Sequence, residues 1–166
     1  MPNILYMTVS RDGFIARTND ETPWGDDSWS AFREFVKSCD VILLGKRTYE
    51  IMDAGKEFVE GPEYIVITND SSFNTGNLKK LSISSRADMP QVAKLGIIGG
   101  GDLNGRLAEL DIIDEVILDT EPIDLKAGIK LFGDHDVNPK LELIDSRTLG
   151  ESTLQRHYKV ARSEKD

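Results

Sequence analysis

The chain has 166 residues, with 20 basic and 29 acidic side chains, which gives a net charge of −9 and a pI near 4.8. This acidic balance argues against nucleic acid or an anionic membrane surface as a partner. The single cysteine, Cys39, excludes a disulfide within the chain, and two histidines far apart in sequence do not indicate a metal site.

No linker or low-complexity run divides the chain, so we predict a single domain spanning residues 1–166. Apolar runs such as residues 41–44 are too short to cross a bilayer, and the N-terminus lacks the pattern of a signal peptide. We therefore expect a cytoplasmic protein with no membrane partner.

Residues 4–10 are rich in apolar and β-branched side chains and lead into the turn signal Arg11-Asp12-Gly13, after which residues 14–16 are again apolar. This pattern predicts a first strand with a bent end. The polar segment at residues 18–28 is long enough to form a mobile loop or lid. Its Trp24 either covers a ligand or anchors the loop on the core.

An amphipathic helix follows, with Asp27 or Ser28 as its N-cap. Residues 41–44 predict a buried strand, because they are too few for a helix and too apolar for the surface. A glycine turn at residues 45–48 then leads into a second helix at residues 49–54.

Two cations, Lys46 and Arg47, stand at the start of this second helix, where the helix dipole disfavours positive charge. A bound anion would explain them, because ammonium and guanidinium groups bind phosphate. A solvated basic pair is the alternative interpretation.

Residues 64–68 predict a third strand that ends in small polar side chains, and residues 81–84 predict a short fourth strand. Residues 88–95 predict a short helix, because they begin with a helix-start pattern. That pattern consists of Asp88, Pro90 and Gln91.

Three consecutive glycines separate the apolar run at residues 95–98 from leucines that recur at helical spacing up to Leu110. Glycine lets an anion approach the backbone, and the free N–H groups of a helix's first turn favour phosphate. A tight turn without a ligand is the other interpretation. The dinucleotide fingerprint G-x-G-x-x-G is not satisfied, because Asn104 stands at its third glycine.

Residues 115–120 predict another strand, and residues 141–149 and 153–161 predict an antiparallel hairpin. Strands that alternate with helices through the first two thirds of the chain imply parallel crossovers. The predicted fold class is therefore α/β, with a mixed, mostly parallel central sheet flanked by helices and a C-terminal antiparallel hairpin.

Ligands of such sheets bind at the carboxyl ends of the strands. Residues 45–48, 68–71 and 99–103 all fall at that edge of the predicted sheet. Three candidate phosphate contacts at one edge favour an elongated, phosphorylated ligand.

Five short motifs are spread over nearly the whole chain. They are Ser10-Arg11-Asp12-Gly13-Phe14-Ile15-Ala16, Leu44-Gly45-Lys46-Arg47-Thr48-Tyr49-Glu50, Ile98-Gly99-Gly100-Gly101-Asp102-Leu103, Asp114-Glu115 and Gly128-Ile129-Lys130-Leu131-Phe132. In this order and spacing they resemble the dihydrofolate-reductase-like superfamily. The resemblance is closer to the reductase domain of the bifunctional riboflavin-biosynthesis deaminase-reductase.

The resemblance implies NADPH as hydride donor. The bent end of the first strand would hold the nicotinamide, Lys46 or Arg47 would pair with the 2′-phosphate, and the three glycines would hold the pyrophosphate. The candidate cofactor-binding residues are Thr8, Ile15, Ala16, Gly45, Lys46, Arg47, Thr48, Thr68, Asn69, Gly99, Gly100, Gly101, Asp102 and Leu103.

The resemblance further implies an oxidoreductase that transfers a hydride to a pyrimidine- or pterin-like heterocycle, similar to the pyrimidine reductase of riboflavin biosynthesis. Dihydrofolate reductase is one alternative, although Trp29 stands where folate reductases carry a carboxylate. A non-catalytic nucleotide-binding module of the same fold is another. Asp119 replaces a threonine that is usual in the family.

Asp12 and Asp27 are candidate catalytic residues, because both are expected to face the nicotinamide end of the cleft. Each has a local alternative, Asp12 as a turn residue and Asp27 as a helix cap. The exposed edge of the hairpin, together with the dimers common among related reductases, predicts a homodimer.

Overall fold

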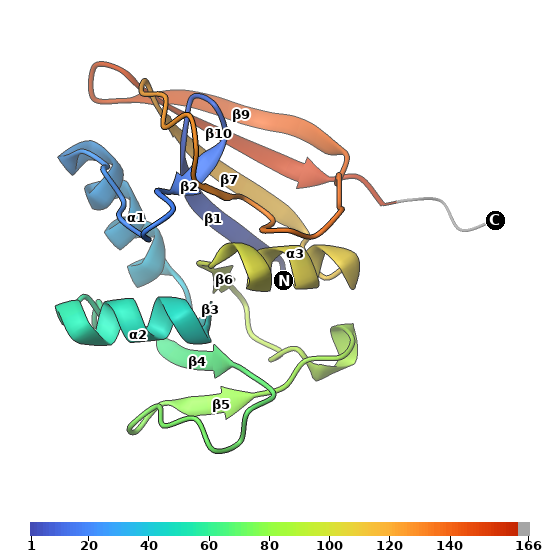
Figure 1. Ribbon diagram of the computed structural model, residues 1–166. Coiled ribbons are helices and arrows are strands. Elements are labelled where there is room, and N and C mark those ends of the chain that lie inside the picture. Colours follow the sequence, from blue (N-terminus) through green and yellow to red (C-terminus); the bar gives the residue numbers. More distant parts are fainter. Residues whose placement is uncertain (163–166) are drawn as a thin grey trace.

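The computed structural model describes residues 1–162 and shows an eight-stranded sheet with the strand order β5-β4-β3-β6-β1-β7-β10-β9 (Figure 1). In this order, the strands β5, β4, β3, β6, β1 and β7 all run parallel, whereas β10 is antiparallel to both β7 and β9. The predicted mixed α/β fold with a C-terminal hairpin is thus confirmed. The strands of this sheet are β1 Asn3–Ser10, β3 Val41–Gly45, β4 Glu63–Ile67, β5 Lys79–Leu81, β6 Leu95–Ile97, β7 Glu115–Glu121, β9 Leu141–Leu149 and β10 Thr153–Val160.

Two short strands, β2 (Phe14–Ala16) and β8 (Ile129–Lys130), pair with each other outside the main sheet. The described helices are α1 (Asp26–Ser38), α2 (Lys46–Gly55), α3 (Gly101–Glu109) and a 3₁₀ turn at Arg86–Asp88. No helix among residues 1–162 is long and apolar enough to cross a membrane.

Alternate side chains of the central strands feed two hydrophobic cores, because successive residues of a strand point to opposite faces. On one face, strand residues such as Tyr6 and Ile42 pack with α1 and α2 through Phe35 and Met52. On the other face, Leu5, Leu43 and Ile65 pack against α3 through Leu103 and Leu107. The sheet is thereby covered on both sides.

The ends of β3 and β6 lie side by side, and the backbone N–H of Gly45 donates a hydrogen bond of 2.8 Å to the carbonyl of Gly99. Helix α2 begins directly after Gly45, and α3 begins directly after Gly100. Two helix N-termini therefore start from neighbouring points of the same sheet edge.

The predicted helix at residues 88–95 is wrong. Asp88 closes a single 3₁₀ turn, in which its carboxylate accepts hydrogen bonds from the N–H groups of Ser84 (2.7 Å) and Ser85 (3.1 Å). Met89 then takes an extended conformation and is buried in the core. Pro90 explains this, because the residue before a proline is disfavoured in the helical region.

The predicted N-cap of the first helix is also wrong, because α1 already begins at Asp26. The buried carboxylate of Glu121 organises this entry, since it accepts hydrogen bonds from the Gly25 N–H (2.9 Å) and the Ser28 hydroxyl (2.6 Å). Two other boundaries differ by a few residues: α2 starts at Lys46, and β5 precedes the strand predicted at residues 81–84.

Candidate functional site

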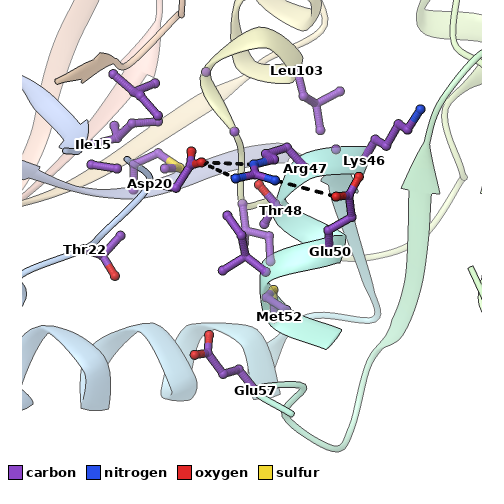
Figure 2. A pocket seen from close by; sticks show the side chains of 18 of the residues that line it. Ile15, Asp20, Thr22, Lys46, Arg47, Thr48, Glu50, Met52, Glu57 and Leu103 are labelled. Carbon is purple, nitrogen blue, oxygen red and sulfur yellow. Dashed lines mark hydrogen bonds and ion pairs between the residues drawn. The ribbon is translucent and has the colours of Figure 1, made fainter. Parts of the chain in front are cut away.

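A pocket of about 1030 Å³ opens at the carboxyl ends of β1, β3 and β4, between α1, α2 and the start of α3. Figure 2 shows part of its lining, in which Arg47 of α2 reaches Asp20 on one side and Glu50 of its own helix on the other. The pocket collects residues from most of the predicted motifs. Its two ends differ in chemistry.

One end is built for anions. The first turns of α2 and α3 both line the pocket, and backbone N–H groups in a helix's first turn have no partner within the helix. A Cβ on Gly45 would lie 3.5 Å from the Leu103 Cβ and 3.6 Å from the Gly100 nitrogen, so the two turns approach closely here. Two converging N-termini give this end a positive potential before any side chain is considered.

Lys46 and Arg47 add full positive charges to this end, and both already have acidic neighbours. The Lys46 Nζ lies 3.4 Å from the Asp70 carboxylate. The Arg47 Nε and Nη2 donate to one oxygen of Asp20 at 3.0 and 2.7 Å, and Nη1 lies 3.6 Å from Glu50. The hydrogen-bonded Asp20 raises the pKa of the Arg47 guanidinium above its ordinary value.

Asp102, in the first turn of α3, is negatively charged beside this end of the pocket. Its carboxylate is paired with the imidazole of His135 at 2.8 Å, and the other ring nitrogen of His135 lies 2.7 Å from Glu109. Hydrogen bonds that the imidazole donates to these two carboxylates, Asp102 first, raise the pKa of His135. The imidazole therefore offsets part of the negative charge that Asp102 brings to the helix start.

The other end of the pocket is aromatic. Trp29 and Phe32 from α1 lie edge to face with ring centroids 6.0 Å apart, and Trp24 from the preceding loop joins them in the lining. Thr8 and Ile15 also form part of the wall. An apolar, aromatic-walled cavity of this kind suits a flat heterocycle.

A buried polar row lies behind this wall. Asp119 on β7 is opposite Thr8 on β1 and opposite Gln155 on β10. Its carboxylate accepts hydrogen bonds from the Tyr6 hydroxyl and from the Gln155 amide, the latter at 2.8 Å. Burial raises the pKa of the Asp119 carboxyl, and burial followed by the charge of Asp119 raises the pKa of Tyr6.

All of the sequence-predicted cofactor-binding residues except Gly99 line this pocket. Gly99 lies just beneath it, buried, with its carbonyl bonded to Gly45. The expectation that Asp12 and Asp27 face the pocket is wrong, because both lie outside its lining.

Asp12 instead ties two loops together: it accepts hydrogen bonds from the Ser10 hydroxyl at 2.5 Å and from the N–H groups of Leu125 (3.1 Å) and Lys126 (2.7 Å). The hydrogen bond from Ser10 contributes most to lowering the pKa of Asp12 to about 2. Asp27 is exposed in the first turn of α1, against Gly150 in the β9–β10 turn.

Several residues that line the pocket were not named as site residues from the sequence. The segment at residues 56–59 follows α2 and closes one side of the pocket, and Tyr6 and Ile129 contribute from strands. Only the tertiary arrangement brings them to the site. The period-2 alternation of β1 could have placed Tyr6 on the same face as Thr8.

No protein-family model matches the chain. Two curated relatives come from Bacillus subtilis (strain 168). The uncharacterized protein YwjB is 26% identical over 167 residues, which cover 93% of this chain and 95% of YwjB. The uncharacterized protein YyaP is 24% identical over 176 residues, which cover 93% of each chain.

Solved structures give a closer description of the fold. A protein from Shewanella sp. PV-4 assigned to riboflavin biosynthesis superposes with a TM-score of 0.77 at 20% identity, over 98% of this chain and 100% of that one. The dihydrofolate reductase of Enterococcus faecalis, solved with NADP(H), gives a TM-score of 0.68 at 17% identity, over 97% of each chain.

The diaminohydroxyphosphoribosylaminopyrimidine deaminase/5-amino-6-(5-phosphoribosylamino)uracil reductase of Thermotoga maritima gives a TM-score of 0.71 at 17% identity. The match covers 96% of this chain and 56% of that enzyme, so the chain corresponds to about half of the larger protein. The chain has the dihydrofolate-reductase-like fold, which it shares with pyrimidine reductases of riboflavin biosynthesis and with dihydrofolate reductase.

Proposed function

We propose that the protein is an NADPH-dependent reductase that transfers a hydride to a pyrimidine- or pterin-like heterocycle. The observation that carries this proposal is the two-ended pocket. Two helix N-termini with Lys46 and Arg47 form one end, and the aromatic side chains Trp24, Trp29 and Phe32 form the other. An elongated ligand with phosphates at one end and a flat ring at the other matches this division.

The residues at the anion-binding end of the pocket fit the phosphate groups of NADPH. Gly45 and Gly100 leave space that a side chain would narrow, because a Cβ on Gly100 would lie 3.5 Å from the Thr48 hydroxyl oxygen. Gly101 has a different reason to be glycine: a Cβ there would lie 2.7 Å from the Lys130 carbonyl. The fit therefore rests on the open helix starts and the two cations.

NADPH, when bound, supplies the hydride. The residues of the chain would do the rest. The first turns of α2 and α3 would hold the phosphates, and Thr8, Ile15 and Ala16 would support the reactive ring against β1 and β2. The aromatic end would bind the acceptor heterocycle, exclude water and hold the two reacting rings in register.

Dihydrofolate reductase activity is the second candidate, supported by the likeness to the enzyme of E. faecalis. A turnover assay with dihydrofolate beside pyrimidine substrates separates the two. Tight NADPH binding without turnover of any heterocycle would favour a nucleotide-binding module instead.

The cofactor assignment is tested by replacing Lys46 and Arg47 together with Ala. We expect NADPH affinity to fall at least about tenfold, because two charge-assisted contacts to the 2′-phosphate are lost, whereas NADH affinity changes little. Fluorescence titration with both cofactors measures this. A Lys140→Ala/Lys159→Ala variant carries the same charge change just before β9 and on β10, outside the pocket lining. Equal losses for NADPH and NADH would contradict the assignment.

A further inference from the structure

Arg47 is held by a residue of the opposite wall. Asp20 comes from the loop between β2 and α1, and its side chain is 22% exposed, compared with 66% for Arg47. One carboxylate oxygen of Asp20 accepts two hydrogen bonds from the guanidinium, at 3.0 and 2.7 Å. Figure 2 shows this contact running across the pocket.

The loop is shaped to present this carboxylate. The Asp20 N–H donates to the Arg17 carbonyl at 3.0 Å, and the Arg17 N–H donates to the Glu21 carbonyl at 2.8 Å, so residues 17–21 form a closed turn. Asp20 has a φ of 71°, a left-handed conformation that aspartate and asparagine tolerate better than most residues.

Carboxylates and phosphates compete for the same donors, because both present oxyanions to the planar fork of an arginine. We propose that Asp20 is a built-in competitor for the phosphate that Arg47 binds, so that a phosphorylated ligand must displace it. This proposal rests on the proposed function, because it assigns Arg47 to the phosphate end of the cofactor.

Displacement of Asp20 from Arg47 also affects the rest of its loop. The loop that carries Asp20 also carries Thr22 and Trp24, and both line the same pocket toward the heterocycle end. Release of Asp20 by the phosphate therefore frees the segment that walls the acceptor site. Binding of the phosphorylated cofactor and rearrangement of the loop are coupled through this one ion pair.

The ion pair of Lys46 does not join two walls of the pocket as that of Arg47 does. It pairs with Asp70 at 3.4 Å, and the two side chains are 46% and 45% exposed. Asp70 lies just after β4, on the same side of the site as α2, and its carboxylate is also engaged by Ser72. The contact that joins the loop to the helix is the one made by Arg47.

The test removes the charge of Asp20 and keeps its shape. Asp20→Asn should bind NADPH and adenosine 2′,5′-bisphosphate about three- to fivefold more tightly than the wild type, the upper part of the range expected for loss of a partly exposed ion pair. NADH affinity should change by less than about twofold. In the Arg47→Ala background, Asp20→Asn should have no effect, because the competed group is gone. Isothermal titration calorimetry measures all of these affinities.

The matched control is Asp53→Asn, which makes the same charge change on an exposed position of α2 outside the pocket lining. It should leave all three affinities within about twofold of the wild type. If the wild type binds NADPH but Asp20→Asn binds it no better, or if Asp53→Asn tightens binding equally, the competition is overturned and the proposed function stands. If the wild type binds none of the three nucleotides, the proposed function fails, and the competition fails with it.

Discussion

Asp119 is completely buried, with 0% of its surface exposed, at a position behind the pocket wall. A buried carboxylate is tolerated only with hydrogen-bond partners, and here Tyr6 and Gln155 provide them. Arg147 on the exposed edge strand β9 continues the row by donating to Gln155 at 2.7 Å. The row fixes the position of Tyr6, whose ring lines the pocket. Asp119 is thus a positioning residue in this arrangement.

Asp119 gives the protein a characteristic pH dependence. Burial raises its pKa in the folded state above the ordinary 3.8, so the stabilisation is complete below that value and is lost as the pH rises through the raised pKa. Asp119→Asn cannot ionise. We expect the difference in free energy of unfolding, wild type minus variant, to fall with rising pH over this window. Urea unfolding at several pH values measures it, and other titrating groups cancel in the difference. If the free energies of unfolding of the wild type and Asp119→Asn changed equally with pH, the raised pKa of Asp119 would be contradicted.

Asp12 should act on folding rather than on binding. Asp12→Ala removes three hydrogen bonds, one from Ser10 within the β1–β2 turn and two that join this turn to residues 125–126, so we expect the melting temperature to fall by several degrees. NADPH affinity should be unchanged. Because its pKa is lowered to about 2, the contribution of Asp12 is present above 3.8 and is lost as the pH falls through 2. Loss of NADPH binding with unchanged stability would restore Asp12 to the site.

At the scale of elements, α3 is packed unusually close to the segment after β8. A Cβ on Gly105, in the middle of α3, would lie 2.3 Å from the Phe132 carbonyl and 2.4 Å from the His135 ring. Asn104 reinforces this contact by donating to the Leu131 carbonyl at 2.9 Å. Helix α3, which begins at the anion-binding end of the pocket, is therefore held by a close backbone contact with the segment after β8.

Gly105→Ala should destabilise the protein by about 2 kcal/mol or more, because backbone atoms must move apart. Ala is favoured over Gly by up to about 1 kcal/mol in a helix, so packing here reverses the usual sign. Gly55→Ala is the matched control in the last turn of α2, where the nearest atom, at 2.7 Å, belongs to the flexible Glu57 side chain. It should be neutral or stabilising. Urea unfolding compares the two, and equal stabilities would refute this account of α3.

The sequence predicted the elements whose signals are local. The alternation of buried strands with glycine turns located β3, α2, β6 and α3, because each glycine marks the junction where a strand becomes a helix. The helix at residues 88–95 failed because Pro90 stops it after one turn, a preference that outweighed the start pattern. The predicted cap of α1 was wrong because the helix begins at Asp26 after Gly25, where Glu121 of β7 accepts hydrogen bonds from the Gly25 N–H and the Ser28 hydroxyl.

The residues of the site also fall into those that local sequence signals predicted and those that they did not. Residues next to glycine turns were found, because the carboxyl edge of a parallel sheet is predictable from strand order. Asp12 and Asp27 were misplaced because the direction of a side chain in a loop or first helical turn depends on partners far away in sequence. The Asp20–Arg47 contact is of the same kind, since it joins residues on different walls of the pocket.

At the scale of the whole molecule, β9 is an edge strand whose outer side has no neighbour among the described strands. It exposes Leu143 (57%) and Ile144 (55%), two large apolar side chains on an edge that could otherwise pair with a second chain. The homodimer predicted from the sequence remains a prediction, and this edge is where it would form.

Light scattering at micromolar concentration should give twice the chain mass of 18.5 kDa. Leu143→Glu/Ile144→Glu should shift it to the monomer mass, because buried charge at the interface is costly. An Asp145→Asn variant on the same strand serves as a control and should leave the mass unchanged. A monomer mass for the wild type would remove the dimer.

The strand order also sets the order in which the protein can assemble during synthesis. β1 leaves the ribosome before the other strands, yet it lies between β6 and β7 and pairs with both. Its two partners are translated only at residues 95–97 and 115–121, so β1 lacks one or both of its neighbouring strands while two thirds of the chain is made. The nascent chain should therefore depend on chaperones that bind apolar segments, and translational pausing before residue 115 should promote aggregation rather than folding.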